Sequence, residues 1–135
     1  MTKRDIIYNK FNGHCAYCGC ELHKGWHVDE MIPVQRGKEY IKDKRGNRIW
    51  DDKRREWKTK SIVLHPENFN IDNQMPACAS CNINKHSLSI EDFRLLIQGF
   101  MKHLNERNTQ YKIAKRYGLV QEDIKPVIFY FENLK

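Results

Sequence analysis

Two short cysteine pairs, far apart in the sequence, constrain the fold of this chain more than any other feature. Cys15-Ala-Tyr-Cys18 and Cys78-Ala-Ser-Cys81 each place two thiols in one tight turn. Zinc prefers four tetrahedral ligands, and two such pairs are typical of a structural four-thiolate site. We therefore expect one zinc ion to join the two turns and to fix the geometry of the residues beside them.

The cysteine pattern also indicates a cellular compartment. Five cysteines could suggest an extracellular disulfide protein, but the paired spacing favours metal binding in a reducing cytoplasm. Cys20 is the odd one, and we interpret it as a bystander thiol, with competition for the zinc as the lesser alternative. The first residues lack the apolar segment of a signal peptide, and no apolar run approaches the length of a membrane span. We expect a soluble cytoplasmic protein with no membrane partner.

The chain carries a net charge of +7, and most of this charge lies in one segment. Residues 36–60, here called the basic insertion, contain eleven Lys or Arg and five Asp or Glu. Such a local excess favours a polyanionic partner, most often nucleic acid, over a purely solubilising role. Two alternatives are open: a disordered surface loop, or a DNA-contacting hairpin with its turn at Arg45–Arg48. Trp50 and Trp57 favour order, because free loops seldom carry two tryptophans.

Local patterns predict an α+β fold. Apolar residues at helical spacing predict a short helix over 2–11, and Ser89 with Asp92 predicts the capped start of a longer helix. An apolar stripe follows this cap and is expected to pack in the core: Ile90, Phe93, Leu96, Ile97, Phe100, Met101 and Leu104. Three further elements are expected: a strand over 26–32 ended by Pro33, a helix over 109–117 ended by Gly118, and an aromatic strand over 127–131.

Several side chains near the cysteine turns have the chemistry of a second metal site. Asn82 and His86 are four residues apart, so on a helix they share one face, and Asp29 at the end of a strand could approach the same ion. A carboxylate, an amide oxygen and an imidazole suit Mg²⁺, Mn²⁺ or a similar cation. The alternatives are that Asn82 is only a helix cap and His86 an ordinary exposed residue.

The same residues resemble the HNH endonuclease family in its zinc-knuckle branch. That family carries C-x-x-C, then Asp-His closely followed by Pro, then Asn, then C-x-x-C-Asn-x-x-Lys. The matching text here is Cys15-x-x-Cys18, Val28-Asp29-Glu30-Met-Ile-Pro33, Asn73 and Cys78-x-x-Cys81-Asn82-x-x-Lys85. The resemblance covers about residues 5–98, and the tail within 99–135 looks like extensions of phage and bacterial members. It implies one domain over 1–135 with a ββα-metal fold, in which a strand and a helix hold one divalent cation against the scissile phosphate.

Carried over position by position, the resemblance implies a role for each matching residue. Asp29 is the expected strand ligand of a catalytic Mg²⁺ or Mn²⁺, Asn82 the helix ligand, and His86 a further helix ligand. Asn73 is expected to brace the loop and to orient the general base. A set of basic residues is expected to grip the nucleic-acid backbone: Arg36, Lys53, Arg54, Arg55 and Lys85.

One position departs from the family pattern. The general base of the family is the His directly after the strand Asp, and this chain has Glu30 there. Three interpretations follow. In the first, Glu30 is the base, although a carboxylate is intrinsically weaker than imidazole. In the second, His27, which alternation places on the face of Asp29, is the base or binds the metal. In the third, the base is lost.

The sequence as a whole predicts a metal-dependent DNA endonuclease of HNH type that acts on double-stranded DNA. The alternative is a catalytically weak or inactive zinc protein that keeps the scaffold and binds nucleic acid. RNA is a further possible substrate. The retained Asp29, Asn73, Asn82 and His86 favour the enzyme, because a pure binder has no need for a cation site.

Overall fold

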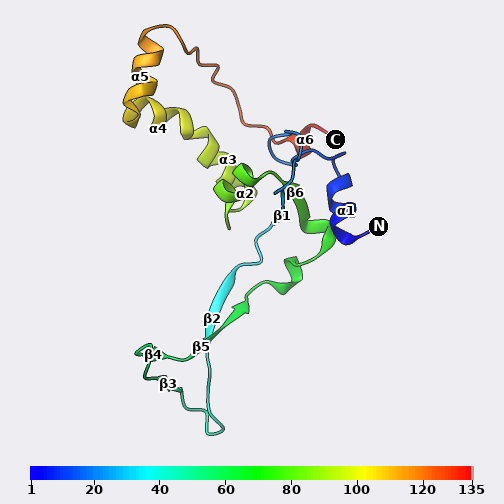
Figure 1. Ribbon diagram of the computed structural model, residues 1–135, viewed down its shortest axis with the longest axis vertical. Helices are drawn as coiled ribbons and strands as arrows, with labels where there is room; N and C mark the ends of the chain where they lie inside the picture. Colours follow the sequence, from blue (N-terminus) through cyan, green and yellow to red (C-terminus); the bar gives the residue numbers. More distant parts are fainter. Residues whose placement is uncertain (135) are drawn as a thin grey trace.

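The computed structural model describes residues 1–134 and has a mixed α+β fold with small sheets, as predicted. Figure 1 shows a central body that carries both ends of the chain, from which the basic insertion projects on one side and a helical extension on the other. Within the described residues, the strands form three antiparallel pairs: β1 with β6, β2 with β5 and β3 with β4. No helix in residues 1–134 has the length and apolar character needed to cross a membrane.

The central body is built on a strand pair followed by a helix. Strand β1 (His27–Glu30) runs antiparallel to β6 (Gln74–Ala77), and α2 (Ala79–Lys85) begins directly after β6. Helix α1 (Lys3–Asn9), which confirms the predicted N-terminal helix, starts at a capping box formed by Thr2 and lies against β6. Two 3₁₀ turns, Pro66–Asn68 and Ile71–Asn73, precede β6. In the sequence, the first cysteine turn precedes β1 and the second directly follows β6.

An aromatic cluster fills the core beside the first cysteine turn. Tyr17 lies edge-on to Phe93 at 5.7 Å and to Phe129 at 5.8 Å, and the Phe93 and Phe129 rings stack at 5.4 Å. All three side chains are almost fully buried. Phe129 comes from near the end of the chain, so the C-terminal segment returns to the central body.

The aromatic strand predicted over 127–131 is wrong. Tyr130–Asn133 forms the short helix α6 instead. The Tyr130 and Phe131 amides donate to the carbonyls of Tyr17 and Ala16 at 2.9 Å, and the Phe129 amide donates to the Glu132 carboxylate. The first cysteine turn presents these two carbonyls but no strand edge. The segment therefore binds the turn by two hydrogen bonds and continues as a short helix.

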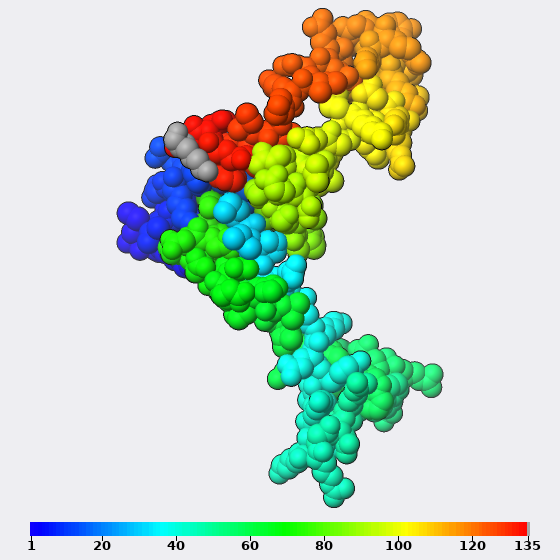
Figure 2. Space-filling view, turned by 180° about the vertical axis from the view of Figure 1, so that it is seen from behind, coloured from blue at the N-terminus to red at the C-terminus, as the bar shows by residue number. Residues whose placement is uncertain are grey.

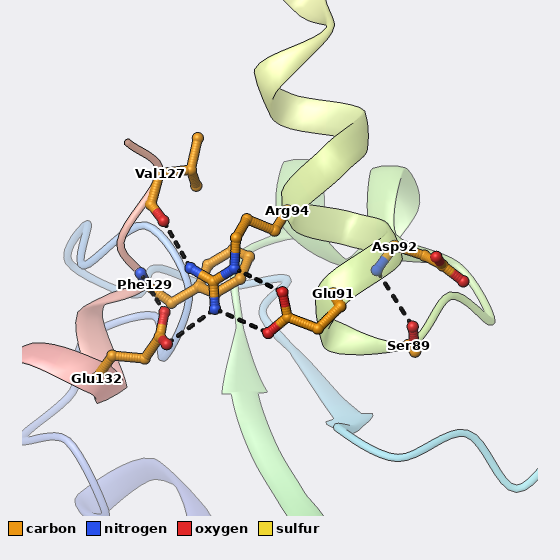
Figure 3. A network of polar contacts seen from close by, with 7 residues as sticks. All are labelled: Ser89, Glu91, Asp92, Arg94, Val127, Phe129 and Glu132. Carbon is orange, nitrogen blue, oxygen red and sulfur yellow. Dashed lines mark hydrogen bonds and ion pairs between the residues drawn. The ribbon is translucent and has the colours of Figure 1, made fainter. Parts of the chain in front are cut away.

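Arg94 fastens this returning segment to helix α3 (Ile90–Gln98). Its guanidinium donates to the Val127 carbonyl at 2.6 Å and pairs with Glu132 at 2.8 Å and with Glu91 at 3.0 Å (Figure 3). It also lies over the Phe129 ring at 4.8 Å from the centroid. One side chain thus joins the helix, the returning backbone and the aromatic cluster.

The helix predicted to follow Ser89 begins as expected but is shorter. The Ser89 hydroxyl accepts from the Asp92 amide at 3.2 Å, which confirms the cap (Figure 3). The helix breaks at Gly99, and α4 (Phe100–Arg107) and α5 (Thr109–Arg116) project away from the body (Figure 1). Phe93 is fully buried, and Ile90 and Ile97 pack against the core, which confirms the prediction for these three residues. Leu96 and Phe100 are exposed, so the prediction of core packing is wrong for them. Helix α5 ends before Gly118, as predicted.

The basic insertion forms an antiparallel ribbon of β2 (Arg36–Tyr40) and β5 (Thr59–Val63). Its end carries two small hairpins: one closed by the Lys42–Arg48 bridge, and one formed by β3 (Trp50–Asp51) and β4 (Glu56–Trp57). The two tryptophans pack edge to face at 5.2 Å. The alternative of a disordered loop is therefore wrong: the insertion is an ordered hairpin, and one of its end turns lies where the sequence predicted it. Contact with DNA stays a prediction. Figure 2 shows how far the insertion stands out from the body.

Candidate metal centre and catalytic site

The two cysteine turns meet and form a four-sulfur cluster. The ligand atoms of Cys15, Cys18, Cys78 and Cys81 all lie within 4.8 Å of one another, and Cys18 and Cys78 are 3.8 Å apart. Zinc–sulfur bonds of about 2.3 Å in a tetrahedron place neighbouring sulfurs about 3.8 Å apart, so the cluster fits a zinc ion. Cys20 lies outside this group, which agrees with a bystander role.

Hydrogen bonds link the sulfur atoms of the cluster to one another and to the backbone. The Cys81 amide donates to the Cys78 sulfur at 3.4 Å, as backbone N–H groups commonly do around metal-bound sulfur. A hydrogen bond from the Cys81 thiol lowers the pKa of Cys15 to about 4 and raises the pKa of Cys81 itself. Burial raises the pKa of Cys18. A metal binds cysteine as the thiolate, so metal binding here would release protons, and it is the convergence of the four sulfurs that indicates a zinc site.

Asp29 lies beneath the surface of the central body, with only 7% of the residue exposed. Its Oδ2 accepts a hydrogen bond from the Tyr17 hydroxyl and lies 3.0 Å from the Lys85 ammonium. Burial raises the pKa of the Asp29 carboxyl, and the bonds from Tyr17 and Lys85 oppose this shift. Both contacts use Oδ2, so Oδ1 is the oxygen through which Asp29 could bind a cation.

Lys85 was predicted to grip the nucleic-acid backbone, and the structure contradicts this role. Its side chain is completely buried. The ammonium group donates to the Glu30 carbonyl at 3.1 Å and pairs with Asp29. The last turn of α2 packs on β1 and directs Lys85 inward, because the Asp29 carboxylate offers it a buried partner. Lys85 therefore holds the helix to the strand and sets the charge around Asp29.

Four of the predicted site residues line one cavity beside this ion pair. Asp29, Glu30, Asn82 and His86 all border a cavity of ≈ 400 Å³. A second cavity of ≈ 390 Å³ is bordered by Asp29, Glu30, His86 and, at the base of the basic insertion, Arg36. A larger cavity of ≈ 800 Å³ lies among α3, α4 and residues 122–127, and none of these four site residues borders it.

The residues around the smaller cavities do not form a closed metal site like that of the cysteines. In residues 1–134, no second group of three or more His, Cys, Asp or Glu side chains lies close enough together to hold a metal ion. A cation there would be held by a few protein donors, Asp29, Asn82 and His86, with water completing its shell. Mg²⁺ is bound in this way in many proteins, because it gives up its water reluctantly.

His86 has an unusual backbone at the end of α2. Its φ is 49° and its ψ is −126°, a conformation that costs a residue other than glycine about 1–3 kcal/mol. Asn82 lies within the helix, and its carbonyl accepts the His86 amide at 3.0 Å. The cap of α2 is Cys78, so the alternative that Asn82 is only a helix cap is wrong. His86 therefore combines a strained backbone with a position at the border of the cavity.

Replacing His86 with glycine is therefore expected to stabilise the protein. Glycine adopts positive φ without a steric penalty, and we expect the free energy of unfolding to rise by about 1 kcal/mol. His103→Gly is the matched control: this exposed histidine lies inside α4, where glycine should destabilise by roughly 0.5 kcal/mol. Chemical denaturation measures both changes. A loss of stability in the His86 variant would contradict a strained backbone.

The neighbours of Glu30 include one residue that the sequence did not indicate. Gln74 faces Glu30 across the strand pair, and its Nε2 donates to Oε1 of Glu30 at 3.4 Å. The Gln74 Oε1 is buried and has no hydrogen-bond partner among the described atoms. A buried amide oxygen beside a carboxylate is suited to bind a water molecule. The only sequence signal was its place next to Asn73.

Asn73 supports the loop after β1, whereas His27 lies away from the cavities. Asn73 accepts from the Ile32 amide at 2.9 Å and donates to the carbonyls of Ile32 and Asn68, so it braces the loop after β1 as predicted. His27 is exposed, pairs with Ala77 at the other end of β1, and is not among the residues bordering either cavity. The structure does not bring His27 to the site.

The remaining predicted contacts lie at the far end of the basic insertion. Lys53, Arg54 and Arg55 occupy the exposed turn between β3 and β4, and the Lys53 and Arg54 amides donate to Asp51. This turn is well separated from β1 and α2, whose residues border the ≈ 400 Å³ cavity (Figure 1). Comparison with models of known families, with curated proteins and with solved structures found no match to this chain.

Proposed function

We propose that the protein is a metal-dependent DNA endonuclease that hydrolyses phosphodiester bonds in the manner of HNH enzymes. One observation carries the proposal: Asp29, Glu30, Asn82 and His86 border one cavity on a strand–strand–helix unit that the four-cysteine cluster joins. A cation-binding donor set and a carboxylate base side by side are the minimum for this reaction.

The residues divide the work of hydrolysis between them. Oδ1 of Asp29, the Asn82 amide oxygen and the His86 imidazole would bind the cation, which when present stabilises charge on the phosphate and on the leaving 3′ oxygen. Glu30 would take a proton from the attacking water. As the water oxygen bonds to phosphorus, the bond between phosphorus and the 3′ oxygen breaks. Gln74, with its buried unpaired carbonyl oxygen, would hold the water against Glu30.

Lys85 supports this assignment through charge. Adjacent carboxylates at Asp29 and Glu30 would repel a phosphate if nothing neutralised them. The buried Lys85 ammonium, 3.0 Å from Asp29, offsets one of these negative charges. The site then needs only a divalent cation to accept an anionic substrate.

The second candidate function is nucleic-acid binding by a weak or inactive scaffold. Two observations favour it: Glu30 occupies the position where the family has its histidine, and Oδ2 of Asp29 is already engaged by Tyr17 and Lys85. Under this alternative the buried pair is purely structural. The two functions differ in whether divalent metal changes the substrate covalently.

Cleavage of supercoiled plasmid with added Mg²⁺, with added Mn²⁺ or with no added divalent metal tests the proposal. We expect metal-dependent nicking or linearisation that falls at least about tenfold in Asn82→Ala, because a ligand is lost. Asn84→Ala is the matched control, since Asn84 lies on the same helix and only bonds the Ser80 carbonyl. His86→Gly should also lose cleavage while gaining stability.

Two results would contradict the enzyme. One is plasmid left intact with every metal by protein that binds it. The other is equal cleavage by the Asn82 and Asn84 variants, which points to a contaminating nuclease. A labelled RNA tested in parallel decides between the two polynucleotides.

A further inference from the structure

The β2–β5 ribbon has two chemically different faces. Side chains alternate along a strand, so the pairing register assigns every residue of the ribbon to one face or the other. One face, here called the cationic face, carries hydroxyl and basic groups and no acid: Arg36, Lys38, Tyr40, Thr59, Ser61 and Val63. The opposite face carries one basic and one acidic residue among apolar neighbours: Gly37, Glu39, Lys60 and Ile62.

A third cation joins the cationic face beyond the end of β2. The Arg48 guanidinium lies over the Tyr40 ring, 4.0 Å from its centroid. Arg48 itself is held by its bridge to Lys42. Arg36, Lys38 and Arg48 thus give this face three positive groups, while the Glu39–Lys60 pair leaves the opposite face without net charge.

The cationic face continues directly into the candidate catalytic cavity. Arg36, its first residue, borders the ≈ 390 Å³ cavity together with Asp29, Glu30 and His86. Each strand residue advances about 3.3 Å, so Lys38 lies roughly 7 Å further out and Tyr40 roughly 13 Å. The ribbon leads away from the central body without folding back over it (Figures 1 and 2). A polyanion seated in the cavity would therefore meet these cations in succession.

We propose that the cationic face of the ribbon carries the DNA backbone that flanks the scissile phosphate. This inference rests on the proposed function for the position of the cut. The basic groups would neutralise successive phosphates, and the Thr59 and Ser61 hydroxyls would donate hydrogen bonds to phosphate oxygens. The opposite face is turned away from the DNA. The ribbon is thus a one-sided track rather than a charged loop without orientation.

Binding of a labelled DNA duplex, measured by fluorescence anisotropy at several salt concentrations in buffer without added Mg²⁺, Mn²⁺ or chelator, tests the orientation. Lys38 and Lys60 lie on neighbouring strands but on opposite faces, so they form a matched pair. Lys38→Ala is expected to weaken binding and to reduce the slope of log K against log salt by about one, the loss of one phosphate contact. Arg48→Ala should act in the same direction, whereas Lys60→Ala should leave affinity and slope unchanged.

Photo-crosslinking locates the track relative to the cut. The crosslinker p-benzoylphenylalanine, placed at position 38, should react with DNA within about five nucleotides of the cleaved bond, and at position 60 it should not react. If binding depends on the face but the DNA is never cleaved, the one-sided DNA-binding face is supported. Only the proposed endonuclease activity is then contradicted. Equal effects of Lys38→Ala and Lys60→Ala, no effect of Lys38→Ala, or no duplex binding by the parent protein would each overturn the track.

Discussion

Replacing Cys78 with serine is expected to release the zinc and to unfold the central body. Structural zinc contributes about 10–16 kcal/mol in small zinc domains, as much as or more than the roughly 5–15 kcal/mol by which a native domain is stable. The cysteine cluster joins the turn that carries Tyr17 to the start of α2, so the aromatic core and the candidate site both depend on it. Few contacts join the central body to the projecting basic insertion, so the insertion cannot compensate for the loss of zinc.

Metal analysis and circular dichroism measure this effect. The parent protein should contain about one zinc per chain and should unfold on treatment with a chelator. Cys20→Ser is the control, because Cys20 lies outside the cluster and its loss should leave both zinc and fold intact. A well-folded Cys78→Ser protein without zinc would show that the four sulfurs are not a structural metal site.

Replacing Glu30 with glutamine is expected to reduce metal-dependent cleavage by about 10²–10⁴-fold, the usual effect of losing a general base. Glutamine keeps the size of the side chain but cannot accept the proton of the attacking water. Glu106→Gln is the control, since Glu106 is exposed on α4, away from the cavity. Single-turnover cleavage at saturating Mg²⁺ separates this chemical step from binding. Unchanged cleavage in Glu30→Gln excludes Glu30 as the base.

Three further variants test which residue is the general base and whether Asp29 is required. Glu30→His restores the Asp-His pair of the family, so higher activity in this variant would identify Glu30 as a poor substitute. Lower activity would identify it as a working residue, which we expect because Gln74 is placed to support a carboxylate. His27→Ala should be nearly neutral, because His27 does not border the cavity. Asp29→Asn should abolish cleavage.

The buried Asp29–Lys85 pair affects how such variants are interpreted. Removing one partner of a buried ion pair leaves an uncompensated charge and typically destabilises by about 3–5 kcal/mol. Loss of activity in an Asp29 variant therefore supports the metal-ligand role only when the variant is shown to remain folded. Glu30, Asn82 and His86 are more accessible, so their variants report on chemistry more directly.

Short-range signals in the sequence determined the local elements. The spacing of each cysteine pair fixes two sulfurs in one turn, Ser89 caps its helix by a bond to a residue three positions away, and Gly118 ends α5 with a φ of 74°. These features depend on neighbours along the chain, so composition and spacing are enough to predict them. The four-cysteine cluster followed because zinc chemistry demands a partner for each pair.

Tertiary structure alone decided which groups are buried and which faces they occupy. From the sequence, Lys85 is expected to be a surface cation. It is buried because α2 packs it against Asp29, which lies on a strand far away in the sequence. The aromatic run near the end of the chain becomes a docked turn and a short helix because the carbonyls of the first cysteine turn accept two of its amides. The faces of the basic insertion exist only once β2 and β5 pair in register. In each case the stabilising contact joins segments that are far apart in the sequence. A local sequence pattern does not show which distant segment will lie beside it.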